Sequence, residues 1–330
     1  MKAISIRTLI PALAAVGVLA LALQPACVQA QDAYPSKPIH LVVPFPPGGA
    51  VDILGRLIGQ HLSEQLHQSV VVENRAGANG TIAYEYTAKS APDGYTILIG
   101  SNGLATNTSL YPNRTFSELE SLAPIAKLGS SPLIMVVPAN SPYQTLKDVT
   151  DAAKADPAKI SYASAGSGSS AHLGSEMLKS VTGTDMLHIP YKGGAPAIVD
   201  LTAGRVSFML LDPLQALPQI ESKRLRPIMV ADPARLPLIP SVPSAVDAGY
   251  PKLEASVWWG FVAPKDTPQP IIEALNKQIN AALTKPDVRE RLSAMGVREA
   301  SGSPDDFGTF LHDQAATWGA LIKSAHITNE

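Results

Sequence analysis

The sequence of 330 residues contains 26 Lys and Arg against 28 Asp and Glu, a formal net charge of −2, and only 5% of it is aromatic. No stretch concentrates basic side chains. This argues against nucleic acid as a partner, because such binding needs clustered Lys or Arg and usually stacking aromatics. A chain of this length exceeds the size at which one hydrophobic core usually stops growing, so we expect two lobes.

The first thirty residues are typical of an export signal. Lys2 and Arg7 precede an apolar run over 9–23, and the segment ends in Val28-Gln29-Ala30, which is similar to a small-x-small cleavage pattern. The run is short for a membrane span, and no later segment has about 18 uninterrupted apolar residues. We therefore expect a periplasmic protein that begins near Gln31 once the signal is removed.

Cys27, the single cysteine, lies inside this segment. Lipid attachment at Cys27 is the alternative to cleavage after Ala30, although Gln24-Pro25-Ala26 is a poor match to the tripeptide that precedes such sites. Without the segment, the chain has no thiol for a disulfide, a metal site or catalysis. Loss of Lys2 and Arg7 brings its net charge to −4.

After the signal, strand-like and helix-like patterns alternate. The first group has strands over 39–45, 70–73 and 95–99, with helices over 53–66 and 82–90. The second has strands over 122–128, 133–137, 160–163, 186–189, 206–211 and 227–230, with helices over 146–155, 171–181 and 195–203. A strand over 257–263 then leads to helices over 270–283, 286–295 and 304–324. This alternation predicts an α/β fold with two open, mainly parallel sheets and helices on both faces.

The last three helices have too few strands to form a domain of their own, so we assign them to the first group. One lobe then comprises 31–135 and 256–330, and the other comprises 136–255. The chain would cross twice between the lobes. Ligands of open parallel sheets lie outside the carboxyl ends of the strands, so we expect a ligand cleft between the lobes.

The junction from Phe45 to Asp52 is the first candidate for ligand contact. A buried strand ends in prolines, and Gly48 and Gly49 open onto an amphipathic helix. The N–H groups of a helix's first turn lack partners within the helix and favour an anion, and glycine lets a ligand approach the backbone. Phe45 and Pro47 would form walls of the pocket. A tight turn without any ligand is the alternative, because glycine also serves sharp turns.

Polar groups follow other predicted strands as well, as a ligand cleft would require. They are Ser101 and Asn102 after one strand, Ser164-Ala165-Gly166-Ser167-Gly168-Ser169 with His172 after another, and Asp212 after a third. Donors outnumber metal-type ligands, so we expect a small carboxylate held by charge-assisted hydrogen bonds. Asp212 is expected either to recognise an amino or hydroxyl group or to cap the following turn.

The 164–172 segment also allows other interpretations. A flexible linker is the alternative that the composition favours, but the helical apolar stripe that follows and the helix-capping serines favour a functional loop. The Gly-x-Gly-x-x-Ala spacing is a weak dinucleotide fingerprint, but Asp185 precedes the next strand instead of ending it. Ser167, His172 and Asp212 could form a hydrolase triad, yet no Gly-x-Ser-x-Gly elbow is present. The seven histidines show no metal-binding spacing. We therefore expect no cofactor, no metal and no enzymatic activity.

Several motifs resemble those of the Bug family, which are extracytoplasmic solute receptors of tripartite tricarboxylate transporters. They occur in the family's order along essentially the whole mature chain: Pro44-Phe45-Pro46-Pro47-Gly48-Gly49 with Asp52, Val70-Val71-Val72-Glu73-Asn74-Arg75-Ala76-Gly77-Ala78-Asn79-Gly80, Ala91-Pro92-Asp93-Gly94-Tyr95-Thr96, Tyr162-Ala163-Ser164-Ala165-Gly166, His172-Leu173, Pro190-Tyr191-Lys192-Gly193 and Trp318-Gly319. The resemblance implies a two-lobed, type II-like periplasmic binding fold and a carboxylate ligand. It also implies delivery to a large and a small integral membrane subunit by a receptor that we expect to be monomeric.

In that family the loops that match 45–52 and 164–170 grip one carboxyl group, partly through water, and strand ends of the second lobe select the ligand's far end. This chain has Ala50-Val51 where the family often has Gly, Ser or Thr, which removes a possible hydroxyl but keeps the backbone donors. We predict a receptor that captures a small organic acid by hinge closure of its lobes. The alternatives are a sensor partner of a membrane kinase with the same fold, and an exported hydrolase.

Overall fold

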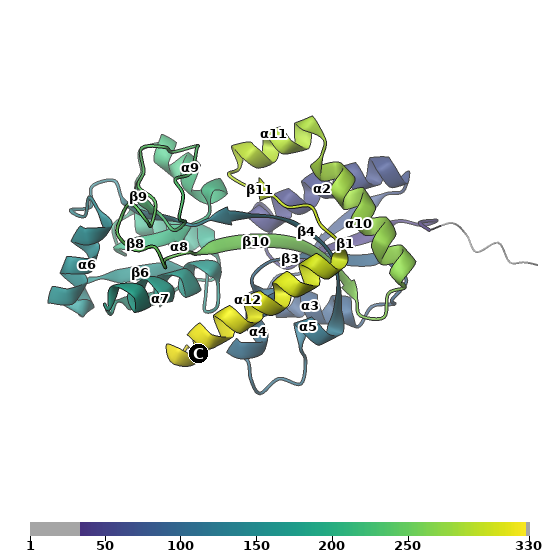
Figure 1. Cartoon of the computed structure of the whole chain (residues 1–330), viewed down its shortest axis with the longest axis horizontal. Helices are drawn as coiled ribbons and strands as arrows, with labels where there is room; N and C mark the ends of the chain where they lie inside the picture. The colour runs from purple at the N-terminus through teal and green to yellow at the C-terminus, as the bar shows by residue number, and fades with distance from the viewer. Residues whose placement is uncertain (1–33, 328–330) are drawn as a thin grey trace, which may run out of the picture. The chain divides into compact units, whose positions relative to one another are not determined.

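The computed structural model describes residues 34–327 (Figure 1). The predicted export signal lies outside the described residues. The compact unit that holds the strands begins at Lys37. Within the described part of the chain, no helix combines the length and the apolar character that a membrane span needs.

One sheet has six strands in the order β11-β4-β10-β3-β1-β2. β1 pairs in parallel with β2 and β3, whereas β10 runs antiparallel to β3 and β4, and β11 runs antiparallel to β4. In chain order the strands are β1 (Ile39–Val43), β2 (Val70–Asn74), β3 (Thr96–Gly100), β4 (Leu122–Pro132), β10 (Ser256–Pro264) and β11 (Arg298–Glu299).

Helices cover both faces of this sheet, which explains why β1 is apolar and buried at every residue except the exposed His40. On one face α2 approaches so closely that a side chain at Gly55 would lie 3.2 Å from Ile99 and 3.4 Å from Val43. On the other face, Val42 and Leu98 pack with α3, α4 and α12 (Figure 1). The helices are α2 (Ala50–Leu66), α3 (Thr81–Ala88) after a 3-10 turn (Ala78–Gly80), α4 (Gly103–Leu110), α5 (Glu118–Ser121), α10 (Gln269–Leu283), α11 (Pro286–Ala294) and α12 (Pro304–Ser324).

The second sheet has five strands in the order β7-β6-β8-β5-β9. β6 pairs in parallel with β7 and β8, and β5 runs antiparallel to β8 and β9. The strands are β5 (Ile134–Pro138), β6 (Ser161–Ser164), β7 (Leu187–Pro190), β8 (Phe208–Leu211) and β9 (Leu225–Val230). The helices are α6 (Leu146–Ala155), α7 (Ser170–Thr182), α8 (Gly194–Thr202) and α9 (Pro213–Glu221), with a 3-10 turn (Pro157–Lys159).

The α/β class and the two helix-flanked sheets are confirmed, but the expectation of mainly parallel sheets is wrong, because both sheets are mixed. Apolar alternation identifies a strand without its direction. β4 and β5 are nearly continuous yet belong to different sheets, and β10 returns to the first sheet, so these strands run against their neighbours. The helix α4 was not predicted, because it is buried on nearly every side and carries Thr and Asn, which are weak helix formers.

The chain passes between the sheets where β4 leads into β5 and where the segment after β9 leads into β10. Three backbone hydrogen bonds join these crossings: Leu133 N–H to Ala255 O (2.9 Å), Ala231 N–H to Leu133 O (2.8 Å) and Ala255 N–H to Ala231 O (3.0 Å). The crossings are thus held by backbone bonds that do not depend on side-chain packing. The lobe boundaries at 135 and 256 stay a prediction.

Candidate ligand-binding site

The junction between β1 and α2 starts the helix without a side-chain cap. Gly48 has a φ of 85°, in the left-handed region that favours glycine, and Gly49 is the N-cap residue. The N–H groups of Gly49, Ala50 and Val51 have no hydrogen-bond partner among the described residues. The first turn of α2 therefore presents unbonded donors at the positive end of its dipole.

Asp52 fixes this junction from inside. Its buried carboxylate accepts hydrogen bonds from Gly48 N–H (3.0 Å), Arg56 Nε (3.0 and 3.1 Å) and Asn74 Nδ2 (2.9 Å). Burial disfavours the charged carboxylate, but these hydrogen bonds outweigh it and hold the pKa of Asp52 below its usual range. Asn74 Nδ2 also donates to Phe45 O at 3.0 Å, so the end of β2 holds the turn after β1. Asp52 thus supports the loop, and its oxygens are already occupied.

Ser101 and Asn102, which follow β3, are both buried and bond within the protein. Ser101 Oγ donates to Asn102 Oδ1 at 3.2 Å, and Asn102 Nδ2 donates to Ser256 O at 3.2 Å. Asn102 Oδ1 also accepts the N–H of Trp258 at 3.3 Å. These contacts tie the end of β3 to the start of β10, so the structure uses this predicted donor pair to join two strands.

The loop between β6 and α7 has the second set of unbonded donors. Gly166 N–H donates to Ser164 Oγ at 3.1 Å, Gly168 N–H donates to His172 Nδ1 at 3.0 Å, and Ser169 caps α7 by accepting the His172 N–H. The N–H groups that have no partner among the described residues are those of Ala165, Ser167, Ser170 and Ala171. The sequence pattern predicted this loop, and the structure shows which of its amides are left over.

Three aromatic rings lie under this loop. His172 stacks on His188 of β7 with centroids 3.9 Å apart, and Tyr162 stacks on His188 at 4.9 Å. Tyr162 Oη donates a short hydrogen bond to Glu176, which also accepts from Lys179 Nζ at 2.9 Å. Burial lowers the pKa of both histidines to about 4, helped for His172 by Lys179 and for His188 first by His172. Both rings are therefore neutral near pH 7. No motif in the sequence predicted a role for His188 at this loop.

The structure brings this loop against two segments of the other sheet's lobe, the 3-10 turn after β2 and the end of α4. A side chain at Gly168 would overlap Leu110 of α4 and lie 3.2 Å from Asn79 Nδ2. Asn79 Nδ2 donates to Asn107 Oδ1 at 2.9 Å, which joins the segment after β2 to α4, the helix after β3. Asn79 has a φ of 49°, and Ala78 before it has a φ of 46°, a left-handed pair that non-glycine residues rarely adopt. Asn79 is thus a candidate site residue outside the predicted set, although it belongs to the Bug-like motif over 70–80.

Asp212 caps α9. Its carboxylate accepts the N–H of Gln215 at 3.1 Å and a short bond from the Gln215 side chain, and burial raises its pKa even though these bonds oppose the rise. Ser167 Oγ has no hydrogen-bond partner in the described chain, and His172 Nδ1 is taken by Gly168. The three groups of the alternative hydrolase triad are therefore not linked. No group of three metal-type ligands occurs among residues 34–327.

Two hollows on the described surface lie elsewhere. One lies beside His40 and Thr96, where β1 and β3 begin, and the other beside Asn140 and Arg224, next to the end of β5 and the start of β9. Both are at the strand ends opposite to the glycine-rich loops. The hollows and the unbonded donors therefore do not coincide. We place the site at the donors, because hydrogen bonds decide the recognition of a charged group.

Comparisons with known proteins point to one family. A family model described as "Tripartite tricarboxylate transporter family receptor" matches residues 54–327. The protein BugT of Bordetella pertussis is 37% identical over 313 residues, which are 94% of this chain and 96% of that protein. A protein of the tcbD-tcbE intergenic region of Pseudomonas sp. (strain P51) is 40% identical over 307 residues, 92% of this chain and 91% of that one.

Solved structures of related proteins superpose closely on this chain. Rpa4515 of R. palustris with adipate superposes with a TM-score of 0.85 at 33% identity, covering 89% of this chain and 99% of that one. MatC (Rpa3494) from Rhodopseudomonas palustris with bound malate has a TM-score of 0.81 at 28% identity, covering 88% of this chain and 100% of that one. The two-lobed periplasmic binding fold expected from the sequence is thereby confirmed.

Proposed function

Since the chain belongs to the family of tripartite tricarboxylate transporter receptors, we propose that it is a periplasmic binding protein that captures a small organic carboxylate between its two sheets. Delivery of the acid to a membrane permease with a large and a small subunit is part of this proposal. Relatives solved with adipate and with malate support the ligand class.

One observation carries the proposal: two helix starts with unbonded amides, one from each sheet. The first turns of α2 and α7 both leave N–H groups without partners among the described residues. Asn74 links the α2 junction to the end of β2, and Asn79, after β2, lies against Gly168 of the α7 loop. The α2 donors therefore lie at the carboxyl ends of β1 and β2, and Asn79 lies between this region and the α7 loop of the other sheet, where we expect one carboxylate to accept from both.

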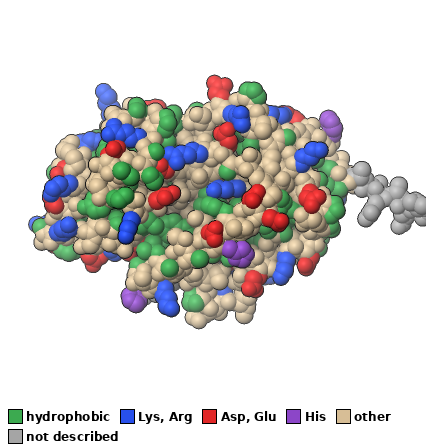
Figure 2. Space-filling model, in the orientation of Figure 1, with side chains coloured by type: hydrophobic (Ala, Val, Ile, Leu, Met, Phe, Trp, Pro, Cys, Tyr) green, Lys and Arg blue, Asp and Glu red, His purple; other side chains and the backbone are tan. Residues whose placement is uncertain are grey.

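The distribution of surface charge favours recognition of the ligand by a few local donors. It does not favour attraction of anions by a broad basic surface. Figure 2 shows Lys and Arg interspersed with Asp and Glu on one face. A single-sign patch would attract many anions over long range, whereas converging backbone donors select a group that fits between them. The motion that would close the site is a hinge at the crossings joined by Leu133, Ala231 and Ala255.

A thermal-shift screen tests the proposal with an acid panel of adipate, malate, citrate, benzoate and glutamate. An acid present at about 100 times its dissociation constant should stabilise the protein by roughly 2.7 kcal/mol. The matched control is the neutral diamide of adipate or malate, which keeps the carbon chain but lacks the charge. Stabilisation by an acid and not by its diamide supports the carboxylate clamp. No shift with any acid, or an equal shift with the diamide, would contradict it.

A further inference from the structure

We propose that His188 positions the 164–170 loop for ligand binding, although it lies outside that loop on β7. Its Nε2 is 2.7 Å from Ser164 Oγ, and its ring stacks on His172 with centroids 3.9 Å apart and an interplanar angle of 11°. Ser164 and His172 are the two side chains that accept the hydrogen bonds of the loop's glycine N–H groups. His188 therefore contacts both of the side chains that hold the loop. This inference rests on the proposed function, because it concerns how the donors for the carboxylate are held.

Ser164 Oγ ties the first turn of the loop. It accepts the N–H of Gly166 at 3.1 Å and lies 3.1 Å from Gly166 O. A hydroxyl has one proton and two acceptor lone pairs, so the His188 nitrogen either donates to Oγ or accepts its proton, depending on the tautomer. In both cases the contact fixes the direction of the Ser164 hydroxyl and, through it, of Gly166.

His172 ties the second turn. Its Nδ1 accepts the N–H of Gly168, which requires that this nitrogen carry no proton. The His172 ring is 5% exposed and lies face to face with His188, with Lys179 as the nearby cation and Glu176 as the nearby anion. A charge on either ring would be poorly solvated and close to the other ring. The stack thus preserves the acceptor that Gly168 uses.

The consequence for binding lies in the amides that remain. Gly166 and Gly168 have φ values of 125° and 77°, and their N–H groups turn inward to Ser164 and His172. The N–H groups of Ala165, Ser167, Ser170 and Ala171, which have no partner among the described residues, are left for a ligand. Without His188, the outward donors would lose their fixed direction, and the cost of ordering them would oppose binding.

The first test is His188→Phe, which keeps a flat ring for stacking but removes Nε2. The probe is the acid of the panel that the wild type binds most tightly. Loss of this partly buried hydrogen bond predicts roughly tenfold weaker binding by calorimetry. Hydrogen exchange of the unliganded variant should rise in peptides covering 164–171 and stay unchanged in β1 and β3. His61→Phe is the control, because His61 is another buried histidine, on α2, with contacts to Glu64 and Asp287.

The second test is a double-mutant cycle with Ser164→Ala. Both changes remove the same contact, so the double variant should bind no more weakly than Ser164→Ala alone. His188→Gln, which places an amide within reach of Ser164, should restore most of the affinity and serves if His188→Phe fails to fold. Equal affinity of His188→Phe and wild type, or full additivity with Ser164→Ala, would overturn the inference and leave the proposed function intact. If the wild type binds none of the five acids, both the inference about His188 and the proposed function are contradicted.

Discussion

Gly49 is the residue at which the proposed clamp can be tested with least disturbance of the fold. Its φ of −81° is ordinary for any residue, and an added Cβ would meet nothing closer than Pro46 O at 3.8 Å. Gly49→Val should therefore fold normally while its side chain stands beside the unbonded amides of α2. We expect every acid that binds to lose at least about tenfold in affinity, equivalent to roughly 1.4 kcal/mol.

Calorimetry of Gly49→Val with each binding acid measures this loss, and Gly49→Ala should give a smaller one. The melting temperature without ligand is the control for folding. Gly48 is unsuitable for the comparison, because its φ of 85° would strain any other residue. Unchanged affinity in Gly49→Val would place the carboxylate elsewhere.

At the residue scale, the sequence predicted which groups can donate but not which are already engaged. Gly48 and Gly49 are candidates because glycines at a strand-to-helix junction let a ligand approach the backbone, although a tight turn alone also uses glycine. Ser101 and Asn102 looked equally suitable, yet their side chains bond to each other and to β10, which is 154 residues distant from Asn102 at Ser256. The partner that consumes a polar group often comes from a remote strand, so local sequence cannot reveal it.

At the element scale, the ring stack joins β6, α7 and β7, and its titration should be visible in stability. The pKa of His172 and of His188 is lowered to about 4, against an ordinary value of 6.5. Between these values the unfolded chain binds more protons than the folded one, so the free energy of unfolding falls as the pH falls. Each histidine contributes at most about 1.4 kcal/mol per pH unit, and His188 less because it is partly exposed.

Urea unfolding between about pH 7 and pH 5.5 measures this dependence in a range where ordinary carboxylates stay ionised. The contribution of these histidines to the free energy of unfolding should be fully present above the ordinary histidine pKa and should decrease steadily as the pH falls below it. His188→Phe removes one of the two groups, so its stability should vary less with pH than that of the wild type. Identical pH dependence in the two proteins would show that the stack does not titrate as described.

Element prediction succeeded where two faces of a strand or one face of a helix is apolar. β1 and α2 have such patterns, and both formed at the expected places. The helix α4 was not predicted, because it is surrounded by protein and therefore lacks the polar face that gives a helix its 3.6-residue alternation of polar and apolar residues. The direction of β4 and β10 was also missed, because direction is set by the connections between the sheets and leaves no local pattern.

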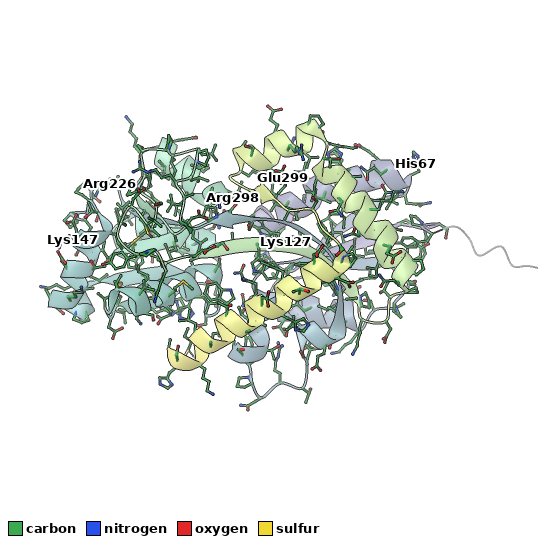
Figure 3. All side chains as sticks on the ribbon, in the orientation of Figure 1. His67, Lys127, Lys147, Arg226, Arg298 and Glu299 are labelled. Carbon is green, nitrogen blue, oxygen red and sulfur yellow. The ribbon has the colours of Figure 1, made fainter. Side chains whose placement is uncertain are left out.

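At the scale of the whole molecule, an ion pair links the two sheets beside the crossings. Arg298 of β11, which is labelled in Figure 3, contacts Asp232, just after β9, with Nη1–Oδ2 at 2.8 Å and Nη2–Oδ1 at 3.3 Å. Ser131 Oγ donates to Gly296 O at 2.6 Å nearby in the chain. The same arrangement of the sheets places the α7 loop against Asn79. The ion pair should therefore favour the arrangement in which the two sets of donors lie together.

Arg298→Met removes this pair while keeping a long apolar side chain. A partly exposed pair is worth up to about 1 kcal/mol, so the binding-competent population, and with it the apparent affinity for a panel acid, should fall roughly twofold to fivefold. Arg235→Met is a matched control, because Arg235 pairs with Asp247 after β9 and its side chain has the same 49% exposure as that of Arg298. Arg235→Met breaks an ion pair that does not connect the two sheets, so the affinity of this variant for the acid should match that of the wild type. If both variants bind equally well, the link between the sheets has no part in binding. A larger loss in Arg298→Met, with the loops unchanged in sequence, would show that affinity depends on how the two sheets are held.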